Sequence, residues 1–229
     1  MLTLNCQALT RDAVASVFAQ DIPVHLTVFD DGSTDGTLPW LRSLPVTVVP
    51  YYHIGVSALW NRGLDHLFYY LQVPHVLVIN NDVRLRSDCY RRLVDDGGEF
   101  VTCVGTSSGA EWPGGEPSGK KRPHPDFSCW LIRRECWLKV GKFDERMKVY
   151  ASDGDYHLRM HRAGVEAYCL DLPFWHYASG TLKEAGEEEQ ERILKQAQAD
   201  REAFERKWGF AMGSPEYYKQ FEEVGCPLT

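Results

Sequence analysis

The stretch His75-Val76-Leu77-Val78-Ile79-Asn80-Asn81-Asp82 decides the fold. Its apolar run, rich in β-branched residues, ends in two amides and a carboxylate, which is typical of a buried parallel strand with polar groups at its carboxyl end. In open α/β sheets, ligands bind in the crevice beyond such ends, so Asp82 is placed to meet a metal ion or a phosphate. A strand followed by an ordinary turn explains this stretch, taken alone, equally well.

Strand and helix patterns alternate on the amino-terminal side of this stretch. The elements expected there are strands over 2–4, 24–29, 45–50 and 75–79, and helices over 10–20, up to 41 and over 57–71, with Thr10 as a helix cap. Because each strand is followed by a helix, this order predicts a parallel sheet with crossover helices.

The carboxyl-terminal side contains one long segment without periodicity, 106–127, which is rich in Gly, Pro, Ser, Lys and Arg. Loops of that length are usually binding loops or lids, or else disordered. The elements expected around it are strands over 100–105, 129–132 and 165–170 and helices over 87–94, 134–140, 153–163 and 184–208. The last helix is charged, with enough apolar residues on one side to pack against the domain.

The composition narrows the class of protein. A chain of 229 residues with 44% hydrophobic residues can bury one sizeable core, and its net charge of -7 argues against a general nucleic-acid binder. No apolar run reaches the roughly 18 residues of a membrane span, and no signal-peptide pattern precedes the first strand, so we expect a cytoplasmic protein. The seven cysteines are scattered and never form a C-x-x-C pair, which predicts free thiols rather than disulfides or a zinc site.

Three further features carry polar chemistry. Asp31, in the turn Asp31-Gly32-Ser33-Thr34-Asp35-Gly36, could accept the imide N–H of uracil or thymine or bind a ribose hydroxyl, although turn residues alone would give the same pattern. Ser152-Asp153-Gly154-Asp155 opens a helix, where acidic residues are also good caps. His176 could be a core histidine whose ring nitrogens are hydrogen-bonded within the protein, or it could be a nitrogen ligand of a divalent cation.

Taken together, the ordered motifs resemble the family 2 glycosyltransferases of the GT-A fold. The resemblance extends over about residues 2–210. The motifs that carry it are Phe29-Asp30-Asp31-Gly32-Ser33-Thr34-Asp35-Gly36-Thr37, Gly55-Val56-Ser57-Ala58-Leu59-Trp60-Asn61-Arg62-Gly63, Asn80-Asn81-Asp82, Ser152-Asp153-Gly154-Asp155 with Arg159, His176, and Lys207-Trp208-Gly209.

The resemblance implies an α/β fold with a Rossmann-like, mostly parallel central sheet flanked by helices and a C-terminal helical extension. It divides the chain into a GT-A domain over 1–182, with a nucleotide-binding half over 1–105 and an acceptor and catalytic half over 106–182, and an extension over 183–229. It also implies inverting, metal-dependent transfer of a sugar from a nucleoside-diphosphate sugar to an acceptor hydroxyl. The acceptor hydroxyl could belong to a glycan, a protein, a nucleic acid or a small molecule.

The family's functional positions transfer to this chain residue by residue. Asp82 and His176 would hold Mn²⁺ or Mg²⁺, and Asp153 would be the general base, with Asp155 as a secondary candidate. The residues expected to bind the nucleotide are Thr3, Asn5, Asp31, Ser33, Asn61 and Asn81. The residues expected near the acceptor are Trp112, Trp130 and Arg159, although ordinary packing would explain the two tryptophans as well. UDP and dTDP are the favoured carriers because both bases present one imide N–H to Asp31.

The chain departs from the family pattern at three places. The metal-binding triplet is Asn-Asn-Asp, so it keeps one carboxylate; Ser152 replaces the glutamate before the base; and the first strand is a stub. Two other functions remain open. A sugar-phosphate nucleotidyltransferase would need a Gly-rich basic loop where the chain has Asn5-Cys6-Gln7-Ala8. A binding protein on a degenerate transferase fold would have no reason to keep Asp82, Asp153 and His176 together.

Overall fold

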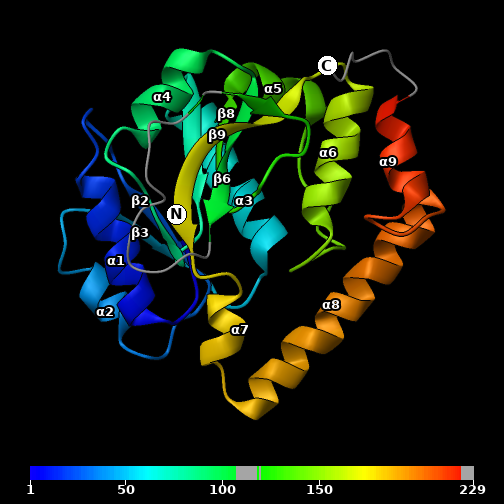
Figure 1. Ribbon diagram of the computed structural model, residues 1–229. Helices are drawn as coiled ribbons and strands as arrows, with labels where there is room; N and C mark the ends of the chain where they lie inside the picture. Colours follow the sequence, from blue (N-terminus) through cyan, green and yellow to red (C-terminus); the bar gives the residue numbers. More distant parts are fainter. Residues whose placement is uncertain (107–117, 119, 223–229) are drawn as a thin grey trace.

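Two sheets form the centre of the fold in the computed structural model, which describes residues 1–106, 118 and 120–222 (Figure 1). The first sheet is parallel, with the order β1-β2-β3. Its strands are β1 (Leu2–Thr3), β2 (Thr27–Asp30) and β3 (Thr47–Pro50), joined by helices α1 (Gln7–Phe18) and α2 (Thr37–Leu41). This half confirms the expected alternation of parallel strands and helices.

The second sheet is mixed. Its order is β4-β8-β6-β9-β5, with β7 also paired to β9. The strands are β4 (His75–Ile79), β5 (Val83–Arg84), β6 (Phe100–Thr106), β7 (Lys121–Arg122), β8 (Cys129–Arg133) and β9 (Ala167–His176). β6 runs parallel to β9, whereas β4 pairs with β8 antiparallel. The expected location of β4 is therefore confirmed, but its expected parallel pairing is wrong, because an apolar run does not specify the direction of its neighbour.

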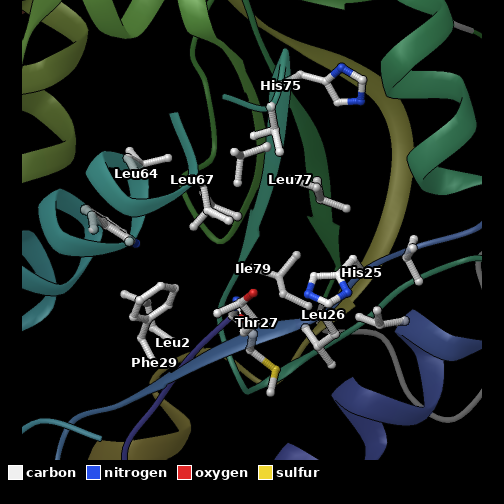
Figure 2. Close-up of a pocket in the computed structure, with 18 of the residues that line it drawn as sticks. Leu2, His25, Leu26, Thr27, Phe29, Leu64, Leu67, His75, Leu77 and Ile79 are labelled. Carbon is white, nitrogen blue, oxygen red and sulfur yellow. Dashed lines mark hydrogen bonds between the residues drawn. The ribbon is translucent and has the colours of Figure 1, made fainter. Parts of the chain in front are cut away.

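An apolar cavity of about 290 Å³ lies where the two sheets meet. Figure 2 shows Leu2 and Phe29 of the first sheet at this cavity, together with Leu67, Leu77 and Ile79. The two-residue β1 is too short to extend along the whole of β4, whose hydrogen bonds within the described ranges go to β8 and its flanking residues. The short first strand thus divides what was expected to be one sheet.

The helices cover both sheets. They comprise α3 (Val56–Asp65), which continues as the π-helix η1 (His66–Tyr70), α4 (Cys89–Asp96), α5 (Arg134–Val140), α6 (Ser152–Arg162), α7 (Gly180–Glu184), α8 (Glu187–Trp208) and α9 (Pro215–Glu222). Helices α7 and α9 were not expected, and the helix expected over 184–208 is confirmed as α8, which begins at Glu187 rather than at residue 184. No helix among the described residues has an apolar stretch long enough to cross a bilayer.

Helix α1 begins at Gln7, so the expected cap at Thr10 is wrong. Cys6 precedes the helix in a left-handed conformation, with φ of 58°. The Thr10 hydroxyl lies inside the helix and donates to the carbonyl oxygen of Cys6 at 3.1 Å. A threonine in the first turns of a helix can bond back to the preceding turn in this way, so its position in the sequence did not identify the cap.

The C-terminal helices are fastened to the sheet domain through buried groups. Figure 1 shows α8 running along the outside of the fold from α7 toward α9. Phe204 of α8 is fully buried against Met147 and Leu158. The buried carboxylate of Asp200 accepts the backbone N–H groups of Lys148, Val149 and Tyr150 at 2.8–3.0 Å, which fixes the segment 148–150 beside α8.

Candidate active site

A cleft of about 690 Å³ opens at the carboxyl ends of β1, β2 and β4. Six of the residues expected from the sequence lie on its wall: Thr3, Asp31, Asn81, Asp82, Asp153 and His176. They come from both sheets and from α6, over more than 170 positions of sequence. The cleft therefore collects the groups that the motifs had indicated separately.

Asp82 and His176 face each other in this cleft. Val83 of β5 pairs with His176 of β9, and this pairing sets the Oδ1 atom of Asp82 3.4 Å from Nε2 of His176. The Gly180 N–H donates to Oδ2 of Asp82 at 3.0 Å. Burial alone would raise the pKa of Asp82, but the bond to His176 and that N–H together lower it. Asp82 is thus held as a carboxylate.

The Asp82 and His176 donors fit a divalent cation. Metal–ligand bonds of about 2.0–2.2 Å at angles between about 90° and the tetrahedral angle place two donors about 2.8–3.6 Å apart. The 3.4 Å between Oδ1 of Asp82 and Nε2 of His176 falls in that range. A carboxylate oxygen and an imidazole nitrogen are suitable ligands for Mn²⁺ or Mg²⁺. Because the chain offers these two donors here, most of the coordination sphere would come from other oxygens.

Asp153 enters the cleft from the first turn of α6. Ala151, just before the helix, adopts φ of 63°, and the chain turns sharply there into the helix. Oδ1 of Asp153 accepts the Gly154 N–H at 2.9 Å. Burial raises the pKa of Asp153, and the negative charge of Asp126 raises it further. A carboxylate made more basic in this way is suited to accept a proton from a hydroxyl.

Asp155 lies outside the cleft wall and is fully buried. Oδ2 accepts a hydrogen bond from Nε of Arg159 at 2.9 Å, and Oδ1 accepts one from Nε1 of Trp208 at 3.0 Å. Nζ of Lys207 lies 2.6 Å from Oδ1. The carboxylate therefore ties α6 to the end of α8. The secondary catalytic role expected for Asp155 does not fit this position, because its charge is already matched within the protein.

Asp31 lies on the wall of the cleft and organises the loop at Ile54 and Gly55. Oδ1 accepts the Ile54 N–H at 2.7 Å, and Oδ2 accepts the Gly55 N–H at 3.1 Å. Burial raises the pKa of Asp31, although both N–H groups and nearby His53 oppose the rise. Each oxygen keeps a second lone pair, so the carboxylate can still accept a bond from a ligand.

The other nucleotide-binding candidates fall into two groups. Thr3 and Asn81 reach the wall, where the Asn81 amide donates to Oγ1 of Thr10 at 3.0 Å and to the Asn5 carbonyl at 3.2 Å. Asn5 and Ser33 are not among the wall residues; the Asn5 N–H donates to Oγ of Ser33 at 2.7 Å. The Asn5 carbonyl holds the wall residue Asn81 in place without lining the cleft itself.

Asn61 is buried and does not line the cleft. Its amide donates to the carbonyl of Phe143 at 3.0 Å and to Oε1 of Glu145 at 2.9 Å, and its oxygen accepts the Phe143 N–H at 2.8 Å. Both donors of the amide nitrogen and one lone pair of the oxygen hold α3 against the loop before α6. The expected contact between Asn61 and the nucleotide does not fit this arrangement.

The acceptor candidates also change. Trp130 is fully buried and stacks on Phe100 with 5.1 Å between ring centroids, so packing explains it and the expected acceptor contact does not fit. Arg159 is engaged with Asp155 and lies off the wall. Trp112 falls outside the described residues.

Two groups of wall residues were not expected from the sequence. Asp126 lies within the aperiodic segment before β8, with its N–H bonded to Oγ1 of Thr102 at 2.9 Å. Glu189 and Arg192, on the first turns of α8, also line the cleft and form a two-bond ion pair at 2.7 and 2.6 Å. A charged helix face predicts exposure to solvent. Only knowledge of how α8 packs against the domain could have placed Glu189 and Arg192 at the cleft.

Comparisons with known proteins give one family and a consistent fold. The family described as Glycosyl transferase family 2 matches residues 1–122. Staphylococcus aureus TarS 1-349 in complex with UDP superposes with a TM-score of 0.59 at 15% identity, covering 91% of this chain and 70% of that one. The mannosyltransferase PcManGT from Pyrobaculum calidifontis, in complex with GDP-Man and Mn²⁺, has a TM-score of 0.58 at 17% identity, covering 96% and 66%. No curated protein sequence matches the chain.

Proposed function

The chain belongs to glycosyl transferase family 2, and from that premise we propose that its cleft moves a sugar from UDP or dTDP to an acceptor hydroxyl, with inversion and with Mn²⁺ or Mg²⁺. It is a nucleotide-sugar glycosyltransferase with a GT-A fold. The donor, the metal and the inversion are proposed on one observation: Asp82, His176 and Asp153 lie together on the wall of one cleft.

Asp82 and His176 are the proposed metal ligands. When bound, a divalent cation would neutralise the negative charge that develops on the diphosphate as it leaves. Asp82 supports this role because its lowered pKa keeps it ionised, and His176 supports it because its Nε2 faces the carboxylate. Among the neighbours, PcManGT was obtained with Mn²⁺. With two protein ligands, we expect the cation to bind weakly until the diphosphate adds its own oxygens.

Asp153 is the proposed general base. The acceptor oxygen attacks the anomeric carbon, its proton passes to the Asp153 carboxylate, and the bond from the anomeric carbon to the diphosphate oxygen breaks with its electron pair on the diphosphate. Attack from the face opposite the leaving group inverts the anomeric centre. The raised pKa of Asp153 supports this assignment because it makes the carboxylate a better proton acceptor.

Asp31 is the proposed nucleoside anchor, with Thr3 and Asn81 beside it on the wall. TarS was obtained with UDP and PcManGT with GDP-Man, so the neighbours include both kinds of base. The preference for uridine or thymidine rests on the spare lone pairs of Asp31, which can accept one imide N–H. We also propose the division into 1–105, 106–182 and 183–229, with the nucleotide on the first part and the acceptor on the second.

The proposal is tested by following release of nucleoside diphosphate from a panel of UDP-, dTDP- and GDP-sugars with Mn²⁺ present. We expect release from UDP or dTDP donors that stops on addition of EDTA and returns with excess Mn²⁺. Asp153→Asn should lower turnover by about 10²- to 10⁴-fold with little change in donor affinity. Asp95→Asn, which alters an exposed acid on α4, is the matched control. Tighter binding of GDP than UDP, or activity unaffected by EDTA, would contradict the proposal.

A further inference from the structure

Three thiols far apart in the sequence meet in the core. Cys89 begins α4, Cys103 lies on β6 and Cys129 begins β8, and their sulfur atoms all lie within 4.8 Å of one another. The Cys89 and Cys103 sulfurs are 3.5 Å apart. All three side chains are fully buried. This is the one group of three or more potential metal ligands, by that spacing, among the described residues.

The fold makes this meeting rigid. β6 and β8 are hydrogen-bonded neighbours, so Cys103 and Cys129 are held by one sheet, and α4 packs across it and brings Cys89. The surrounding core is apolar, with Leu93 and Leu131 among its members. No carboxylate or imidazole joins the three sulfurs within the described ranges, and the site therefore offers three soft donors in a dry environment.

The apolar surroundings of the three sulfurs favour a cation of low charge. Charge in an apolar core is costly unless it is neutralised. A monovalent cation is neutralised when one thiol loses its proton, whereas a divalent cation needs a second thiol to do so in the same core.

We propose that Cys89, Cys103 and Cys129 bind a soft monovalent cation, Cu⁺, in a three-coordinate sulfur site separate from the transferase cleft. A metal–thiolate bond of about 2.3 Å puts three sulfurs in a plane about 4 Å apart, close to the spacing observed. Thiolates select Cu⁺ among the common cations, and the missing fourth ligand disfavours tetrahedral Zn²⁺. Binding involves no change of oxidation state; any thiol proton displaced passes to solvent.

The test is an anaerobic titration of the reduced protein with Cu⁺ in the presence of a coloured Cu⁺ chelator. Wild-type protein should withdraw one equivalent from the chelator, slowly because the sulfurs are buried, and should melt at a higher temperature when loaded. X-ray absorption of the loaded protein should show three sulfur neighbours and no nitrogen or oxygen. Cys103→Ser and Cys129→Ser should each weaken binding by more than the roughly 10- to 100-fold that loss of an outer-shell partner costs.

Cys136→Ser is the matched control, because Cys136 is another fully buried thiol but packs in a different core cluster. It should bind Cu⁺ as the wild type does, and circular dichroism identifies any variant that fails to fold. Three outcomes would overturn the site: no uptake by the wild type, equal uptake by folded Cys103→Ser, or metal neighbours other than sulfur. Loss of two thiols to a disulfide on exposure to oxygen, with no copper uptake beforehand, would identify a redox pair instead.

Discussion

At the scale of single residues, the candidate base and its neighbour form a pair that the sequence did not reveal. Asp153 was identified from its motif position, because a base at the start of a helix follows the family pattern. Asp126 was not, since it lies in a segment with no periodicity and its charge matters only through its position in space. The structure places both on the wall of the cleft, where Asp126 raises the pKa of Asp153.

Removing the Asp126 charge should shift the pH dependence of the reaction. A general base works only when deprotonated, so activity falls as pH drops through the pKa of Asp153, which is raised above its ordinary 3.8. Asp126→Asn removes one repulsive charge and should move this acidic limb to lower pH. The measurement is kcat/KM for donor hydrolysis between pH 4 and 8, with Asp95→Asn as the control. An unmoved limb, or one shifted upward, would show that the two carboxylates are not coupled.

At the scale of elements, apolar periodicity located most strands and helices but not their partners. β4 was expected where it lies, yet the sequence of β4 carries nothing that distinguishes antiparallel β8 from a parallel neighbour. Asp155 makes the same point for helices: as a residue in the first turn of α6, it looked like a cap or a secondary candidate for the general base. Two of its actual partners, Lys207 and Trp208, lie more than 50 residues away at the end of α8.

Asp155→Asn should therefore act on stability. Breaking a buried ion pair by removing one partner costs about 3–5 kcal/mol, and the lower end applies here because Arg159 and Lys207 keep some solvent contact. Urea unfolding should show that loss, while turnover per folded molecule stays near that of the wild type. Glu202→Gln, which removes an exposed pair with Arg206 on the same helix, should change the free energy of unfolding by less than about 1 kcal/mol. Unchanged unfolding with a large drop in turnover would give Asp155 a chemical role instead.

At the scale of the whole molecule, long-range packing brings together groups that the sequence separates. The cysteines contain no C-x-x-C pair, which predicted free thiols, and it gave no sign that three of them meet where α4 crosses the β6–β8 pair. The C-terminal extension was expected to dock by an apolar stripe, and Phe204 does so. What the stripe could not indicate is that two charged residues of the same helix, Glu189 and Arg192, also reach the cleft.

Arg192 gives the C-terminal helix a measurable part in donor binding. Its guanidinium lies on the cleft wall, close enough to Asp31 for that carboxylate to stabilise its charge, and it is now held by Glu189. A diphosphate entering the cleft carries more negative charge than Glu189 and matches the guanidinium's planar fork equally well.

Arg192→Gln should therefore raise KM for the donor by about tenfold, the equivalent of one charged hydrogen bond of about 1.5 kcal/mol, with a smaller effect on kcat. Arg206→Gln alters an exposed arginine of the same helix and should leave both constants unchanged. If Arg192→Gln instead lowered kcat at constant KM, the helix would act on the transferred sugar or the acceptor, and the diphosphate would have to be held by groups of the sheet domain.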